Sequence, residues 1–252
     1  MVVIDFHSHI GKTGKPINFQ KTEEVTIDDV VREQERVGIN FSTAIPFPFA
    51  YPDDVQTNNA KIMSIADRRL LPFVWINPYF LKNNDRRGQD ESELIRTIKE
   101  GRIYGLKVHP VVDGYYPELP LMGPVMEIAK ATGLPVLWHT GWGDLGKPEY
   151  VEECATAFPE VTLVIGHLND TNSPRIARRK QNVYLETSYC SGGRRLAGIV
   201  GKIGSERILF GSDYGVNYPS TAMSVVMEAR LPSKDTENIL GQNAVRLLNL
   251  KT

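Results

Sequence analysis

Two histidines two residues apart, His7 and His9, stand at the end of the apolar stretch 2–7, VVIDFH. Side chains at positions i and i+2 of a β-strand point to the same side, so a strand here would direct both imidazoles into one space. Neutral imidazole is a common ligand of zinc and similar divalent ions. The chain has five histidines, each at the end of an apolar run or just past it: His7, His9, His109, His139 and His167. This pattern indicates a metal site assembled from several strand ends.

The same alternation selects partners for the first two histidines. We expect three further runs to place these residues on inward faces: Leu137 with His139, Ile165 with His167, and Leu209 and Gly211 with Asp213. A catalytic zinc ion usually takes three or four nitrogen and oxygen ligands and keeps one position for water. His7, His9, His139 and Asp213 form such a set, and His167 is expected nearby.

Eight strand-like apolar runs must position these side chains. They cover residues 2–7, 42–47, 71–77, 104–109, 134–139, 161–167, 182–188 and 207–213. Segments with helical periodicity lie between them. One carries apolar residues from Ile27 to Val37 and stops at Gly38; another has Ser92 as its expected N-cap and ends at Gly101. Two more are expected over 123–133 and 148–159, the latter with Pro148 in its first turn.

Strands that alternate with helices predict a parallel sheet with right-handed crossovers. A closed (β/α)8 barrel takes about 250 residues, which matches the 252 residues here. We therefore expect one α/β domain over residues 1–252, folded as a (β/α)8 TIM barrel of the metal-dependent hydrolase type. The active sites of such barrels lie at the carboxyl ends of the strands, where the histidines fall.

Several motifs, in this order, resemble the amidohydrolase superfamily: DFHSH, GLKVHP, LPVLWHTG, VIGHL, LFGSDY and the final ILGQNAVRLLNL. The chain is most similar to the amidohydrolase-related branch (amidohydrolase family 2), which also contains decarboxylases of the aminocarboxymuconate-semialdehyde type. The resemblance implies that His7, His9 and His139 bind a divalent metal. It also implies that Asp213 touches the metal and the attacking water, and that His167 orients the water or polarises the substrate oxygen.

Lys107 and His109 lie on the same strand face in the motif GLKVHP. The role of Lys107 decides whether the site holds one metal ion or two, and the sequence leaves this open. Binuclear members of the superfamily carry a carboxylated lysine on this strand, so Lys107 could bridge a second ion. In the alternative, Lys107 is a buried ammonium paired with Asp5, because a buried charge must be paired or neutralised. We favour one ion, zinc before manganese. His109 is then a substrate-binding or proton-transfer group.

The loops after the strands carry many aromatic residues, which suits a small, partly apolar organic substrate. They are Phe47, Phe49, Tyr51, Tyr115, Tyr116, Trp142, Tyr214 and Tyr218. Tyr116, Trp142 and Tyr214 are the aromatic residues expected to bind substrate, although covering the barrel or an oligomer contact would explain them too. Arg194, beside Arg195, is the expected partner of a substrate carboxylate. In the alternative, both arginines are exposed to water and bind no substrate.

Zinc lowers the pKa of its bound water from 15.7 to about 7. The favoured function is hydrolysis of a small amide, lactone or ester, in which Asp213 takes a proton from this water and returns it to the leaving group. The alternative is a metal-dependent decarboxylase acting on a small unsaturated or aromatic acid. A metal-free lactonase or a barrel without turnover fits the residues less well. This chain lacks the Asp-x-His ending of one class of phosphoesterases and the metal-binding glutamate of TatD-type nucleases.

Charge and cysteine content limit the partners. Twenty-nine basic and 30 acidic residues leave a net charge of −1, which disfavours nucleic acid as a ligand. Cys154 and Cys190 are too few for a disulfide framework, and no apolar run reaches the length of a membrane span. With a strand starting at residue 2 in place of a signal peptide, we expect a cytoplasmic enzyme with a small-molecule substrate. A homo-oligomer is compatible with the sequence.

Overall fold

The computed structural model describes residues 1–12, 24–47, 55–81 and 90–251. The strands are β1 (Ile4–Asp5), β2 (His9–Lys12), β3 (Glu24–Val25), β4 (Phe41–Pro46), β5 (Leu70–Trp75), β6 (Gly105–Val108), β7 (Val136–His139), β8 (Leu163–Gly166), β9 (Val183–Glu186) and β10 (Ile208–Leu209). The α-helices are α1 (Ile27–Val37), α2 (Val55–Met63), α3 (Glu91–Glu100), α4 (Pro110–Asp113), α5 (Leu119–Thr132), α6 (Glu149–Ala157), α7 (Asn172–Arg179), α8 (Gly193–Ile203), α9 (Pro219–Glu228), α10 (Ser233–Glu237) and α11 (Asn243–Leu247).

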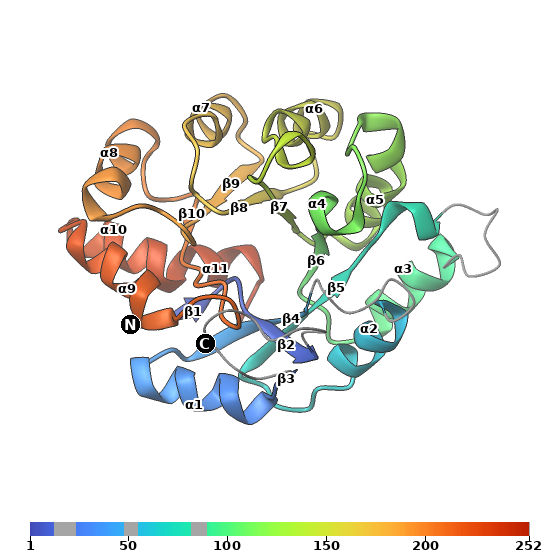
Figure 1. Ribbon diagram of the computed structural model, residues 1–252, viewed down its shortest axis with the longest axis horizontal. Helices are drawn as coiled ribbons and strands as arrows, with labels where there is room; N and C mark the ends of the chain where they lie inside the picture. The colour runs from blue at the N-terminus through green and yellow to red at the C-terminus, as the bar shows by residue number, and fades with distance from the viewer. Residues whose placement is uncertain (13–23, 48–54, 82–89, 252) are drawn as a thin grey trace.

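The strands form one curled sheet with helices around it (Figure 1). Their order is β10-β9-β8-β7-β6-β5-β4-β2-β3, β1 also pairs with β4, and every pairing except β2 with β3 is parallel. The sheet closes where the first strands meet the end of β10. There the Phe6 amide donates to the Phe210 carbonyl at 2.8 Å, and the Asp213 amide donates to the His7 carbonyl at 2.7 Å. The predicted (β/α)8 TIM barrel is thereby confirmed.

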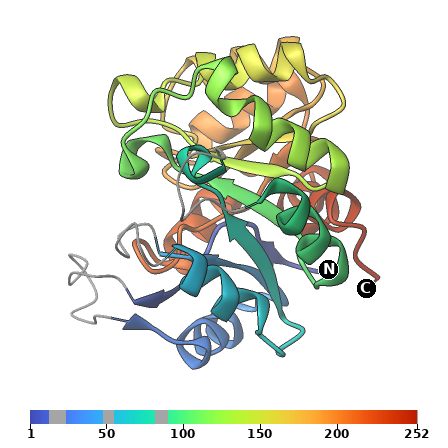
Figure 2. The ribbon, with the colours of Figure 1, turned by 90° about the vertical axis from the view of Figure 1, so that its right-hand side faces the viewer.

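Apolar side chains fill two layers of the barrel. The interior is packed by residues from the strands and from α11: Ile4, Phe6, Ile45, Leu71, Phe73, Trp75, Leu137, Val164, Leu209, Ala244 and Leu248. A larger cluster, which includes Leu106, Val108, Val136 and Trp138, packs the other faces of the strands against the helices. Both chain termini lie at one end of the barrel, and β2 points toward the opposite end (Figure 2).

Local sequence signals account for several helix ends. Thr26 and Asp29 form a reciprocal capping box at the start of α1, and Gly38 ends that helix with a φ of 76°. The expected N-cap of α3 was wrong. Asp90, rather than Ser92, accepts the Glu93 amide, because a carboxylate two residues earlier reaches the same unpaired amides. Pro148 is likewise the N-cap of α6, just before its first turn.

The first strand is not the continuous segment expected over 2–7. It ends at Asp5, bends at Phe6, and pairing resumes with β2 at His9. Ile4 and Phe6 pack inside the barrel, so Asp5 faces the other way and accepts hydrogen bonds from the amide and hydroxyl of Ser212. Burial raises the pKa of Asp5 to about 7. The bend therefore redirects the side chains that follow Phe6.

Candidate metal centre

His7, His9 and Asp213 meet at the closure of the barrel, and all three are buried. The Oδ1 atom of Asp213 lies 3.3 Å from His7 Nε2 and 3.1 Å from His9 Nε2. Ligand atoms about 2.0–2.1 Å from a tetrahedral zinc ion are roughly 3.3 Å from one another. These two distances therefore match those between ligand atoms of one zinc ion, and all three atoms lie within 4.8 Å of one another.

The other ring nitrogen of each of these histidines already has an acceptor. Nδ1 of His7 lies 2.9 Å from Glu186 Oε2, and Nδ1 of His9 lies 3.0 Å from the Pro46 carbonyl. Both contacts place the proton on Nδ1, so Nε2 carries a lone pair toward the Asp213 carboxylate. A lone pair that faces a carboxylate oxygen at this distance is stabilised by a nearby cation, and for His7 Nε2 the Lys107 Nζ atom lies 3.1 Å away. Two imidazole nitrogens beside a carboxylate oxygen are also ligands that a divalent ion prefers. The donor set thus fits a divalent metal ion.

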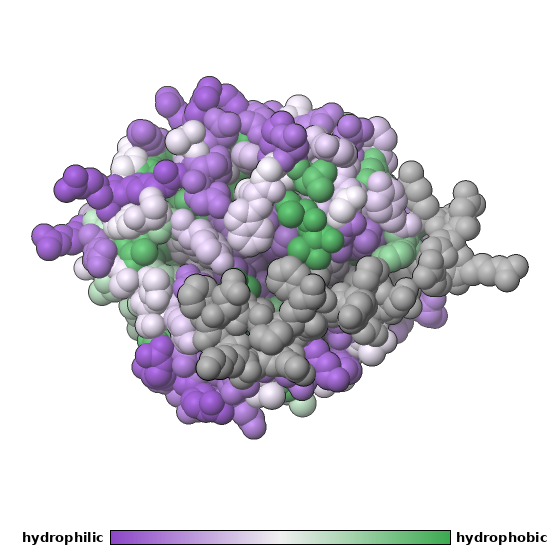
Figure 3. Space-filling model, in the orientation of Figure 1, coloured by the Kyte–Doolittle hydropathy of each residue, from purple (hydrophilic) through white to green (hydrophobic). Residues whose placement is uncertain are grey.

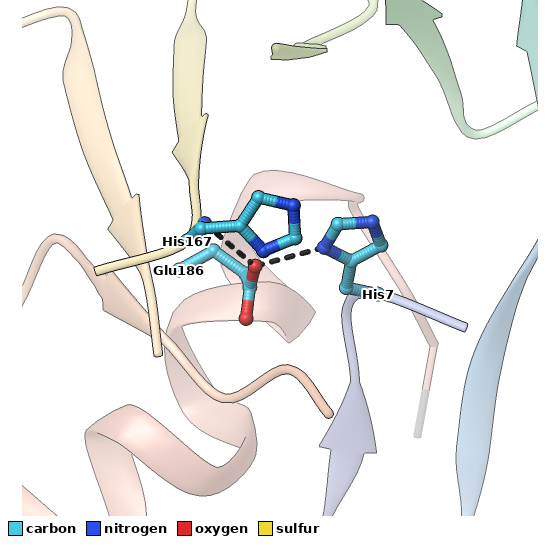
Figure 4. Close-up of side chains that lie close together, drawn as sticks. All are labelled: His7, His167 and Glu186. Atoms are coloured by element: carbon cyan, nitrogen blue, oxygen red, sulfur yellow. Dashed lines mark hydrogen bonds and ion pairs between the residues drawn. The ribbon is translucent and has the colours of Figure 1, made fainter. Parts of the chain in front are cut away.

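Glu186 is the residue of this site that the sequence reasoning missed. It lies in β9, is fully buried, and contacts both the His7 ring and the His167 backbone amide (Figure 4). Burial raises the pKa of its carboxyl group, and hydrogen bonds from Ser188 oppose that effect. A signal was present in the sequence. A lone carboxylate inside the apolar run NVYLET is costly unless it has partners.

His139 and His167 form a pair of their own beside the first three residues. Nε2 of His167 lies 2.8 Å from His139 Nδ1, and Nδ1 of His167 lies 2.7 Å from Ser188 Oγ. Within the described part of the chain, the buried Nε2 atom of His139 has no hydrogen-bond partner. An unpaired buried nitrogen is a rare feature, and a metal ion would supply its partner.

The strand alternation expected for His167 was wrong. Val164 faces the barrel interior and Ile165 faces the helices, which would turn residue 167 outward. His167 instead has a φ of 73°, and this left-handed backbone returns its ring to the barrel axis. Trp142, Tyr189 and Asp213 also have φ values between 56° and 61°. Such conformations are unfavourable for residues other than glycine, and they cluster at functional sites.

Lys107 is fully buried in β6, and its Nζ atom lies 3.1 Å from His7 Nε2. The pairing with Asp5, given as the alternative for Lys107, is wrong, because Asp5 points out of the barrel toward Ser212. Burial lowers the pKa of Lys107 to about 8, although the charges of Asp213 and Glu186 oppose this effect. The amine stands beside the candidate ligands, the position from which it could contact a second ion.

His109 lies behind His139, with the two ring centroids 3.6 Å apart. Its Nδ1 atom accepts the Val112 amide at 3.2 Å, and its other face stacks on Trp75. In this arrangement His109 supports the His139 ring. Among the contacts of the described residues, none joins its ring nitrogens to Lys107 or Asp213.

The protonation states in the site follow from burial. Burial holds the pKa of His7, His109 and His139 well below the usual value, and it lowers that of His167 to about 3. Burial alone would raise the pKa of Asp213, but the contacts with His7 and His9 outweigh it and hold the pKa well below the usual value. Neutral imidazoles around a carboxylate anion are the forms that bind divalent metals.

The residues expected to bind substrate lie in different places. Trp142 is 55% exposed and lies over His139, with ring centroids 4.8 Å apart. Tyr116 is exposed after α4. Tyr214 is buried and directs its hydroxyl to the Asp29 carbonyl, on the side of α1. Tyr189, which the sequence reasoning missed, packs edge-on against His167.

Arg194 is exposed and lines a groove of about 470 Å³ between α7 and α8, over which the surface is largely hydrophilic (Figure 3). Arg195 lies in the same groove and donates to the Asp170 carbonyl. Phe47 is buried against the His9 ring, Tyr115 is buried, and Tyr218 is 39% exposed. Phe49 and Tyr51 lie outside the described residues.

A family model described as Amidohydrolase (Amidohydro_2) matches residues 47–250. The chain belongs to the amidohydrolase family. This membership confirms the resemblance drawn from the motifs and makes the chain a member of an enzyme family whose members are metal-dependent. No curated protein matches the sequence.

Solved structures with this fold include two decarboxylases and a candidate hydrolase. A 2,6-dihydroxybenzoate decarboxylase in complex with 2,6-dihydroxybenzoate superposes with a TM-score of 0.76 at 16% identity, covering 98% of each chain. A 5-carboxyvanillate decarboxylase from Sphingomonas paucimobilis superposes with a TM-score of 0.72 at 14% identity, with 99% of each chain covered. A candidate 2-pyrone-4,6-dicarboxylic acid hydrolase from Pseudomonas putida superposes with a TM-score of 0.69 at 15% identity, covering 98% of this chain and 97% of that one. At these identities the likeness shows the shared barrel fold.

Across the described residues, the helices are all too short or too polar to cross a membrane.

Proposed function

We propose that this amidohydrolase-family protein is a metal-dependent hydrolase of a small organic amide, lactone or ester. The observation that carries the proposal is the contact of His7 Nε2 and His9 Nε2 with one oxygen of Asp213, at 3.3 and 3.1 Å. These three residues, whose ligand atoms lie within 4.8 Å of one another, would hold the ion. His139 Nε2 is outside this group and would be the fourth ligand once its ring moves toward the ion. Nitrogen and carboxylate ligands suit zinc, with manganese as the second choice. When bound, the ion supplies a Lewis acid and lowers the pKa of a water molecule.

The chain's own residues supply the proton transfers and the substrate surface. Asp213 is an anion at neutral pH, so it can accept a proton from the attacking water and return it to the leaving group. Burial, together with the charge of Asp213, raises the pKa of Tyr189, so that its hydroxyl remains neutral beside the His167 ring. Both ring nitrogens of His167 are engaged within the protein, which assigns it to orienting His139. The exposed indole of Trp142 offers an apolar wall for the substrate.

Decarboxylation is the second candidate, because two relatives of the same fold are a 2,6-dihydroxybenzoate and a 5-carboxyvanillate decarboxylase. The two reactions use the same ligand residues and differ in products. Assays that measure hydrolysis of esters and lactones, in parallel with carbon dioxide release from 2,6-dihydroxybenzoate, separate them.

The metal content of the purified protein tests the proposal. We expect about one zinc or manganese ion per chain by elemental analysis, and loss of both the ion and the hydrolytic activity in Asp213→Asn. Two ions per chain would place a carboxylated Lys107 in the centre. A chain that binds no metal after incubation with zinc and manganese would refute the proposal.

A further inference from the structure

The buried carboxylate of Glu186 accepts hydrogen bonds from two directions, called branches below. One branch is His7, and the other runs from Ser188 through His167 to His139. The Oε2 atom of Glu186 accepts the His7 Nδ1–H at 2.9 Å and the Ser188 hydroxyl at 2.7 Å (Figure 4 shows the His7 contact). The Ser188 and His167 backbone amides complete its shell, at 2.5 and 3.3 Å. A carboxylate only accepts hydrogen bonds, so every one of these partners must donate.

The second branch can be followed atom by atom from Ser188. Because its hydroxyl proton points to Glu186, Ser188 Oγ must accept the contact from His167, which places the His167 proton on Nδ1. His167 Nε2 is then an acceptor, and its neighbour His139 donates from Nδ1 across 2.8 Å. A second proton on His139 Nε2 would be buried without an acceptor in the described part of the chain, so this atom carries a lone pair. This is the atom without a hydrogen-bond partner among the described residues.

We infer that Glu186 is a positioning residue that fixes the protons of His7 and His139 on Nδ1 and so leaves Nε2 of both rings unprotonated, as a ligand of a metal ion must be. Glu186 acts on His7 directly and on His139 through Ser188 and His167. The inference rests on the proposed metal centre. It explains why a carboxylate lies in the middle of β9, and it couples ligands that come from two distant parts of the chain.

Three variants separate the branches. Glu186→Gln replaces a pure acceptor with a group that also donates, which breaks both branches. Ser188→Ala breaks only the branch to His139. Thr187→Val is the matched control, because Thr187 is an adjacent buried residue whose hydroxyl contacts only the backbone of Gly211 among the described residues.

Zinc affinity, measured by competition with a chelator, is the first readout. We expect Glu186→Gln to weaken zinc binding about 10–100-fold, since loss of a hydrogen-bond partner behind a metal ligand has effects of this size. Ser188→Ala should weaken it about threefold to tenfold, because His7 keeps its partner. Thr187→Val should bind zinc as the wild type does. Equal affinity in Glu186→Gln and Thr187→Val would overturn the inference.

Nitrogen-15 NMR of the histidine rings in the zinc-free protein is the second readout. We expect Nδ1–H rings for His7, His139 and His167 in the wild type, and loss of this form for His139 and His167 alone in Ser188→Ala. Nε2–H rings for His7 or His139 in the wild type would overturn the inference, even if Glu186→Gln failed to fold. A wild type with Nδ1–H rings that binds no zinc would refute the proposed function while supporting the proton assignment.

Discussion

Asp113 is a half-buried carboxyl group behind the histidines, where its Oδ2 atom accepts a hydrogen bond from the Trp75 indole at 3.0 Å. Burial raises the pKa of Asp113 to about 7, and the bond from Trp75 opposes this effect. Between pH 4 and pH 7 the folded chain therefore keeps a proton that the unfolded chain has released. The contribution of Asp113 to stability is thus present at low pH and is lost as the pH rises through 7.

Asp113→Asn keeps an oxygen acceptor for Trp75 and removes the titration. We expect the variant and the wild type to have similar free energies of unfolding at pH 4, and the variant to be more stable at pH 8, by up to about 4 kcal/mol. Urea unfolding at both pH values measures this difference. Asp28→Asn, which makes the same replacement at an exposed residue, is the control. A wild type that gains stability relative to Asp113→Asn between pH 4 and pH 8 would contradict the prediction.

At the scale of elements, β9 and β10 must approach closely for the site to form. A Cβ atom on Gly211 would lie 2.2 Å from Glu186 Oε1, so only glycine leaves room for that carboxylate. Glu186 cannot yield easily, because four donors hold it in place. The glycine that follows β10 therefore sets the position of a carboxylate on β9.

Gly211→Ala should displace Glu186 and weaken zinc binding at least tenfold, a loss comparable to removing a partner of a metal ligand. Gly198→Ala is the matched control. A Cβ atom at position 198, in α8, meets nothing within 4 Å, and alanine favours a helix over glycine by about 1 kcal/mol. The zinc affinity and melting temperature of both variants test this. Unchanged zinc binding in Gly211→Ala would show that the close approach does not matter.

At the scale of the molecule, the candidate ligands join the two ends of the chain. His7 and His9 precede most of the barrel, Asp213 follows β10, and the hydrogen bonds of Phe6 and Asp213 close the sheet between them. An ion held by these residues would link the first and last strands of the barrel. Metal binding should therefore stabilise the closed barrel as a whole.

We expect zinc at 100 times its dissociation constant to stabilise the fold by about 2.7 kcal/mol. For a domain of this size that is an increase of roughly 5–10 °C in melting temperature. Differential scanning calorimetry with and without zinc measures it. His9→Ala removes a candidate ligand and should abolish the increase, and an equal increase in that variant would place the ion elsewhere.

Much of the fold was predictable because its signals are local. Alternating apolar runs and helical periods gave the barrel, and residues such as Gly38 and Gly101 marked helix ends. The histidines followed strand ends in the sequence, so a cluster at the carboxyl end of the barrel could be predicted from spacing. For His7, His9 and Asp213 the structure shows the proximity that this argument expected.

The contacts within the site required the tertiary structure. Strict alternation failed at Phe6, where the strand bends, and at His167, whose left-handed backbone reverses the direction of its side chain. Asp5 was given as the alternative partner of Lys107 because strict alternation puts it on the same side as His7, whereas the bend at Phe6 leaves Asp5 facing out of the barrel. Glu186 gained its role only when β9 came to lie beside the barrel closure. Spacing along a strand thus determined which residues could gather, whereas backbone bends and contacts between distant strands decided which atoms meet.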